Sequence, residues 1–159
     1  MTNARHLIGL VSDTHGMVRA SIFEALAGVE RILHAGDVGA DDVLTELATI
    51  APVNAVFGNT DAPGNPQHAA ALVLTIGGVT IHVSHGHELG SPTPATLLAA
   101  YPQQVLVYGH THRQLIMEVD GRLIVNPGAA GARRFDLRPT VARLTIERGV
   151  AHVELVPLN

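Results

Sequence analysis

The sequence predicts an α/β fold in which two mixed β-sheets pack together with helices outside. Up to about residue 60, short apolar runs alternate with helical patterns, which is typical of parallel strands joined by helices. Beyond that point, apolar runs are joined by Gly-Gly, Asp-Gly and Arg-Gly pairs, which are typical of antiparallel hairpins. With 159 residues and 47% hydrophobic composition, we expect a single domain over residues 1–159.

The first part of the chain contains three predicted parallel strands. These are Leu7–Val11, Arg31–Leu33 and Val53–Phe57. Apolar residues between them recur at helical spacing, first at Val18, Ile22, Ala25 and Leu26, and then at Val43, Leu44, Leu47 and Ile50. We expect Asp41 to be the N-cap of the second helix and Pro52 to end it.

Three hairpins are predicted in the second part, over residues 72–83, 114–125 and 141–156. Between the first two, a short helix follows Pro94 and is stopped by Pro102, and Val105–Tyr108 forms another strand. A parallel first half joined to antiparallel hairpins predicts the two mixed sheets.

Composition excludes several classes of function. The net charge of −4, with ten Arg and no Lys, lacks the positive footprint of a protein that binds duplex nucleic acid. The absence of Cys excludes disulfides and thiolate metal sites. The apolar run after Arg5 is too short for an export signal or a membrane span, so we expect a cytoplasmic protein without membrane contact.

Polar residues that can bind a metal follow five predicted strands. They are Asp13, His15, Asp37, Asn59, His85, His110 and His112. Ligands of open α/β sheets bind beyond the carboxyl ends of the strands, so we expect these side chains to converge. Nitrogen and oxygen donors without sulfur suit divalent manganese, iron, cobalt or zinc. Seven donors are too many for one tetrahedral ion, so we expect two ions, with the Asp37 carboxylate bridging them.

Glycines beside these donors support the same interpretation, because a chain that turns next to an ion needs space. They are Gly36, Gly58, Gly86 and Gly109. Strands also commonly end in a glycine and a polar residue. Five such ends that hold only metal-binding residue types favour a site over that alternative.

The chain resembles the calcineurin-like metallophosphoesterases in five ordered motifs: Asp13-Thr14-His15, Gly36-Asp37, Gly58-Asn59-Thr60-Asp61, His85-Gly86-His87 and Gly109-His110-Thr111-His112. The short chain and its Asn126-Pro127-Gly128 segment make it most similar to the small prokaryotic phosphodiesterases of the YfcE type. This resemblance implies a four-layer α/β/β/α sandwich of two mixed sheets.

The resemblance also implies a ligand set and an activity. One metal would be held by Asp13, His15, Asp37 and His112, and the other by Asp37, Asn59, His85 and His110. Water bridging the two ions would attack phosphorus in line, with Asp37, Asn59 and His85 as catalytic groups. Manganese is the first expectation for the metal, with zinc, iron, cobalt or nickel as alternatives.

Three residues are predicted substrate contacts: Thr60, His87 and Arg133. Many family members have His where this chain has Thr60, and a threonine hydroxyl is not a suitable proton donor at neutral pH. We therefore expect a preference for esters with good leaving groups. Arg133 offers a forked donor to phosphate, although a solvated loop position is the favoured interpretation. Asp61 is expected to orient a ligand.

Three functions stay open at this point. A phosphodiesterase of small phosphoesters is favoured, and a phosphomonoesterase or nucleotidase would use the same centre. A protein-binding scaffold of the retromer-subunit type is disfavoured, because that branch lacks some of the metal-binding positions and all seven are present here. The sequence leaves the oligomeric state open.

Overall fold

Two mixed β-sheets form the centre of the fold, as predicted. The computed structural model describes residues 4–134 and 136–159. The strands of the first sheet are β1 (Arg5–Val11), β2 (Arg31–His34), β3 (Val53–Val56), β4 (His68–Ala69), β10 (Thr140–Glu147) and β11 (Val150–Pro157). Those of the second are β5 (Leu72–Ile76), β6 (Val79–Val83), β7 (Val105–Val107), β8 (Leu115–Val119) and β9 (Arg122–Asn126).

Both sheets combine parallel strands with hairpins. The first sheet has the order β11-β10-β1-β2-β3-β4, and the second has the order β5-β6-β7-β9-β8. Strands β1, β2 and β3 run parallel, as do β6, β7 and β9. The hairpins β5/β6, β8/β9 and β10/β11 are antiparallel, as their glycine pairs predict. Parallel neighbours end at the same edge of a sheet, which is the condition for a shared site.

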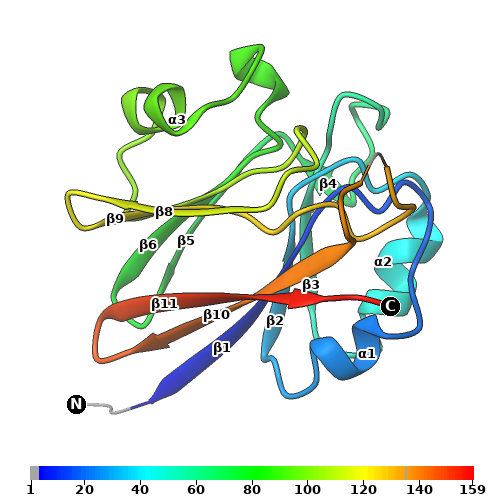
Figure 1. Ribbon diagram of the computed structural model, residues 1–159, viewed down its shortest axis with the longest axis horizontal. Coiled ribbons are helices and arrows are strands. Elements are labelled where there is room, and N and C mark those ends of the chain that lie inside the picture. The colour runs from blue at the N-terminus through cyan, green and yellow to red at the C-terminus, as the bar shows by residue number, and fades with distance from the viewer. Residues whose placement is uncertain (1–3, 135) are drawn as a thin grey trace.

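Helices cover the outer faces of the two sheets (Figure 1). Helices α1 (Ile22–Ala25) and α2 (Asp41–Leu47) lie on the first sheet, and α3 (Pro94–Ala100) lies on the second. A 3₁₀ turn, η1, spans His87–Leu89. Among the residues that the structure describes, no helix has the length and apolar character that crossing a membrane requires.

Two details of the predicted helices are wrong. Helix α1 has only four residues, and Val18 lies in the loop before it. Val18 is apolar because it packs against the core, and the helical spacing that included it was misleading. The N-cap of α2 is Ala40, in an extended conformation, and Asp41 is the first helical residue. The Asp41 carboxylate instead accepts a hydrogen bond from the Asn65 side chain at 3.0 Å.

Three apolar clusters separate the four layers. The first lies between the sheets, the second between the first sheet and α1 with α2, and the third between the second sheet and α3. Strand β1 contributes to two of them, because Ile8 and Leu10 point between the sheets while Leu7 and Val11 face the helices. This two-sided burial, together with α3 on the far side, establishes the α/β/β/α sandwich.

Candidate metal centre

The residues that follow the ends of β1, β2, β3, β6 and β7 meet at one place, as the sequence predicts. They are Asp13, His15, Asp37, Asn59, His85, His110 and His112. Each one contacts at least one other through a side-chain nitrogen or oxygen.

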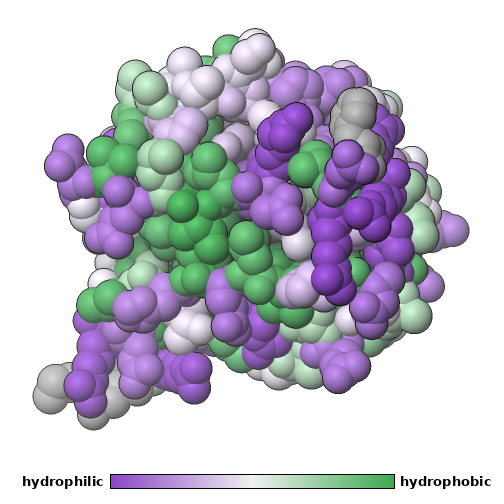
Figure 2. Space-filling view, in the orientation of Figure 1, coloured by the Kyte–Doolittle hydropathy of each residue, from purple (hydrophilic) through white to green (hydrophobic). Residues whose placement is uncertain are grey.

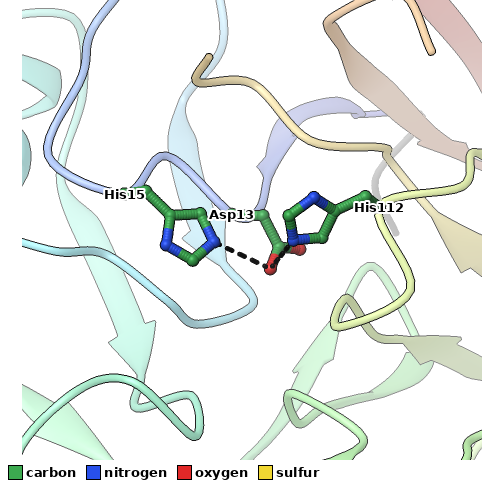
Figure 3. A group of neighbouring side chains, drawn as sticks. All are labelled: Asp13, His15 and His112. Atoms are coloured by element: carbon green, nitrogen blue, oxygen red, sulfur yellow. Dashed lines mark ion pairs between the residues drawn. The ribbon is translucent and has the colours of Figure 1, made fainter. Parts of the chain in front are cut away.

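One group of contacts centres on Asp13. Its Oδ1 atom lies 3.3 Å from Nε2 of His112 and 3.8 Å from Nε2 of His15. Figure 3 shows both imidazole rings directed at this single oxygen. The three side chains together could hold one metal ion.

A second group centres on His85. Its Nε2 atom lies 3.0 Å from Oδ1 of Asn59 and 3.2 Å from Oδ2 of Asp37. The same Asn59 oxygen lies 3.0 Å from Nδ1 of His110. These four side chains offer a second set of nitrogen and oxygen donors.

The two aspartates join the two groups. Oδ2 of Asp37 lies 3.6 Å from Nε2 of His15, in addition to its contact with His85. Oδ1 of Asp13 lies 3.9 Å from Nε2 of His85. Either carboxylate is therefore placed to bridge ions held by the two groups. Asp37 contacts one histidine of each group, His15 and His85, as expected for the predicted bridging residue.

Several buried side-chain atoms at the site have no hydrogen-bond partner among the described residues. Oδ1 of Asp13 and Nε2 of His15 are buried and accept no hydrogen bond from any described residue. Nδ1–H of His85 donates to the Ala35 carbonyl oxygen at 2.8 Å, so its Nε2 carries a lone pair toward the Asn59 and Asp37 oxygens. Buried lone pairs that face one another are costly unless a proton or a metal lies between them.

Electrostatics at the site favour ionised carboxylates. Burial opposes ionisation of Asp13, but the close contacts of its carboxylate with His112 and His15 outweigh that effect and hold the pKa of this carboxyl well below its usual range. Burial also opposes ionisation of Asp37, while His85 and the Thr60 N–H lower its pKa to about 2. Burial lowers the pKa of His85, and the two aspartates reverse that effect and raise it. The two carboxylates thus favour a positive charge next to Nε2, from a proton or from a metal ion.

The backbone at the site adopts an unusual conformation. Five of the seven candidate ligands have a positive φ: Asp13 at 51°, His15 at 46°, Asp37 at 53°, His110 at 72° and His112 at 63°. The other described non-glycine residues with a positive φ are Asp120 and Arg148 in hairpin turns. Such residues cost about 1–3 kcal/mol each and concentrate at functional sites.

Side-chain atoms of the candidate ligands and their neighbours lie so close to the adjacent glycines that no larger residue fits there, as predicted. A Cβ atom on Gly58 would overlap Oδ1 of Asp37, and one on Gly109 would overlap the Ser12 hydroxyl and lie 2.7 Å from Oδ2 of Asp13. Both carboxylates would have to move for any larger residue.

Asp61 and Asn126 form hydrogen bonds with the loops that carry the candidate ligands. Asp61 accepts three backbone N–H groups, from Val38 and Gly39 at 3.0 Å and from Gly58 at 2.9 Å. Asn126 donates to Oγ1 of Thr111 at 3.0 Å and to the Gly109 carbonyl oxygen at 3.2 Å, and it accepts from Gly128 N–H. Asn126 thus forms both a turn and a contact with the histidine loop.

A buried histidine fixes the loop after β1. Gly36 N–H donates to Nδ1 of His34 at 3.1 Å, so Nε2–H donates to Oγ1 of Thr14 at 2.9 Å. Burial keeps this ring neutral and lowers the pKa of His34 to about 4. His34 is thus both a packed strand residue and a support for the segment between Asp13 and His15.

Sequence reasoning missed two supporting groups. The Ser12 hydroxyl donates to Oδ2 of Asp13 at 2.7 Å, and its position directly before the aspartate was the available signal. Glu88 accepts from Gly86 N–H at 2.9 Å and from the Tyr101 hydroxyl at 2.7 Å, which ties the His85 turn to the end of α3. No short motif marks a contact between residues so far apart.

The three predicted substrate contacts lie in different surroundings. Thr60 is exposed, and its N–H donates to Oδ1 of Asp37 at 2.9 Å. The ring of His87 lies 5.4 Å from that of His85, measured between centroids, and its buried Nδ1 has no hydrogen-bond partner in the described chain. Arg133 lines a separate hollow with two other arginines. The first two are thus adjacent to candidate ligands.

Comparison with known proteins identifies the family. The family described as calcineurin-like phosphoesterase superfamily domain matches residues 7–149. A probable metallophosphoesterase of Methanothermobacter thermautotrophicus is 38% identical over 87% of this chain and 80% of its own length. A phosphodiesterase of Methanocaldococcus jannaschii is 29% identical over 89% of this chain and 93% of its own. Vacuolar protein sorting 29 of Cryptosporidium parvum has a similar fold, with a TM-score of 0.81, 23% identity and 98% of each chain covered. This chain is a member of the calcineurin-like phosphoesterase superfamily.

Proposed function

We propose that this protein is a dinuclear metal-dependent phosphodiesterase that hydrolyses small phosphodiesters. The observation that carries the proposal is the convergence of unpaired lone pairs on Asp13, His15 and His85, next to two carboxylates whose pKa values are depressed. A donor set of this kind needs cations and contains no sulfur, which suits manganese or a similar divalent ion. Family membership and the phosphodiesterase relative support the reaction class.

The proposed ligand sets follow the two groups of contacts. Asp13, His15, Asp37 and His112 would hold one ion, and Asp37, Asn59, His85 and His110 would hold the other. Bound ions at this place would lower the pKa of water and offset charge that develops on the phosphoryl oxygens.

The protein's own residues would orient the donors. The Ala35 carbonyl oxygen fixes the tautomer and the ring plane of His85, and the Ser12 hydroxyl fixes the rotation of the Asp13 carboxylate. Thr60 N–H does the same for Asp37. The Thr60 and His87 side chains, next to the ligands, are proposed to contact the substrate.

One assay tests the proposal and separates it from its alternatives. The purified protein is depleted of metal and assayed against phosphomonoesters and phosphodiesters, with Mn²⁺, Zn²⁺ or Mg²⁺ added back. We expect metal-dependent turnover of diesters, strongly reduced in Asp37→Asn and unchanged in Asp42→Asn, an exposed carboxylate on α2. A preference for monoesters would favour the phosphatase alternative. No turnover with any metal would contradict the enzymatic proposal and leave a binding scaffold.

Thr60 leads to a prediction about the leaving group. Because no proton donor of suitable pKa occupies this position, nitrophenyl diesters should be hydrolysed much faster than alkyl diesters. Thr60→His should accelerate alkyl diesters toward the range of about 10²–10⁴-fold that general-acid catalysis provides, with little effect on nitrophenyl esters. Thr60→Ser is the matched control and should behave as wild type. Equal rates for alkyl and aryl diesters in the wild-type protein would contradict this reasoning.

A further inference from the structure

Three arginines line a hollow beside the end of β11. The hollow has a volume of about 370 Å³, and its walls are Arg19, Arg133, Arg138, Pro139, Leu158 and Asn159. Arg19 precedes α1, whereas Arg133 and Arg138 lie in the loop between β9 and β10. Figure 2 shows strongly hydrophilic side chains gathered on the face where this loop lies. None of these residues belongs to the seven candidate metal ligands.

We propose that this hollow is a second anion site, which binds a phosphate group independently of the metal centre. Its charge supports this assignment. Within residues 4–134 and 136–159, the pair of Arg143 with Glu154 is the only arginine–carboxylate ion pair. No described acidic side chain therefore forms an ion pair with any of the three guanidinium groups, and their like charges repel one another.

The hydrogen-bonding capacity of the hollow is also largely unused. Arg19 donates from Nε to the Gly131 carbonyl oxygen at 2.8 Å and from a terminal nitrogen to the Asn159 oxygen at 3.1 Å. Arg138 has one long contact, of 3.5 Å, with the Leu158 carbonyl oxygen. Each guanidinium has five N–H donors, so most remain available to an oxyanion.

The chemistry of the walls favours a phosphate group over other anions. Guanidinium forks match the oxygens of phosphate, which can accept from three arginines at once, and a doubly charged anion offsets the most repulsion. Pro139 and Leu158 add apolar surface that a carbon moiety attached to the phosphate could contact. The volume suffices for a small phosphorylated molecule.

The hollow is connected to the metal centre through the backbone. The Gly131 carbonyl oxygen accepts from Arg19, and the Gly131 N–H donates to the Asp13 carbonyl oxygen at 3.3 Å. The neighbouring Ala130 N–H donates to the Ser12 carbonyl oxygen at 2.9 Å. An anion that moves the Arg19 guanidinium would alter its hydrogen bond with Gly131, and Gly131 is itself hydrogen-bonded to Asp13.

Titration calorimetry with inorganic phosphate tests the site, on the metal-loaded protein and on the same protein after chelation. We expect binding to the chelated wild-type protein, and a loss of affinity of about tenfold in Arg138→Gln and about a hundredfold in Arg133→Gln/Arg138→Gln. Arg148→Gln, an exposed arginine in the β10/β11 turn, should bind phosphate as wild type does. Circular dichroism checks that each sample is folded.

Three outcomes would overturn the proposal. Phosphate could bind the double variant as tightly as wild type, or bind wild type only when the metals are present. Acetate or a glutamate-rich peptide could bind the chelated protein more tightly than phosphate, which would show a carboxylate site. Binding is measured without turnover, so the result stands whether or not the protein proves to be a phosphodiesterase.

Discussion

The Asp61 carboxylate offers a direct test of how the candidate ligands are positioned. It accepts N–H groups from residues 38–39, which follow Asp37, and from Gly58, which precedes Asn59. One side chain therefore joins the two loops that supply the donors around His85. Burial raises the pKa of Asp61, but these three hydrogen bonds outweigh that effect and lower it, so the ionised form makes the contacts.

The magnitude of the effect follows from the contacts. A hydrogen bond to a charged group contributes about 1.5–3 kcal/mol, so three would give about 4.5–9 kcal/mol if no water replaced them. Asp61 is only partly buried, and water will satisfy some of the released N–H groups. We therefore expect Asp61→Ala to lower the free energy of unfolding by about 2–4 kcal/mol. Asp61→Asn keeps one acceptor oxygen, and we expect about half that loss.

Urea unfolding and metal titration measure the two consequences separately. The metal-free variants should unfold at lower urea concentrations, and their affinity for Mn²⁺ should fall by about 10–100-fold, as for other residues that orient ligands. Asp42→Asn, on the exposed face of α2, is the control and should match wild type. If both Asp61 variants kept wild-type stability and metal affinity, these hydrogen bonds would not position the ligands.

Three further predictions follow from the site. Asp37→Asn should weaken the binding of both ions, whereas His85→Ala should mainly release one; equal losses by elemental analysis would contradict the bridging role. Metal content should fall below about pH 6.5, because histidine ligands must be neutral, and a pH-independent content would disagree. His34 is neutral in the fold with a pKa of about 4, so stability is complete above the unfolded value of 6.5 and falls as the pH drops toward 4, by about 1.4 kcal/mol per unit. His34→Gln should show a shallower pH slope of unfolding free energy, and an unchanged slope would refute the assignment.

The order of strands and ligands could be predicted because each strand carries its own signal. The continuous apolar run Leu7–Val11 and the Gly77-Gly78 pair mark their elements locally, and the candidate ligands follow predicted strands of this kind. The edge strand β4 could not be predicted, because its two residues, His68 and Ala69, have no periodic pattern. The same holds for Val18, which is apolar because it packs and not because it is helical.

The detailed geometry of the site depends on contacts between distant residues. Nothing near Asp13 in the sequence indicates its left-handed backbone, which is maintained by hydrogen bonds to Gly36 and Gly131. The link from Glu88 to Tyr101 likewise depends on how α3 packs on the second sheet. Residue types at strand ends predicted which side chains meet, but tertiary packing decides their distances and tautomers.

Anomalous diffraction at the manganese edge, from crystals grown with Mn²⁺, tests the central claim most directly. We predict two peaks about 3.5–4 Å apart, with Asp37 coordinating both and the six other candidate ligands divided between them. A single peak, or two ions that leave Asp37 outside their coordination, would contradict a dinuclear centre built on these strand ends.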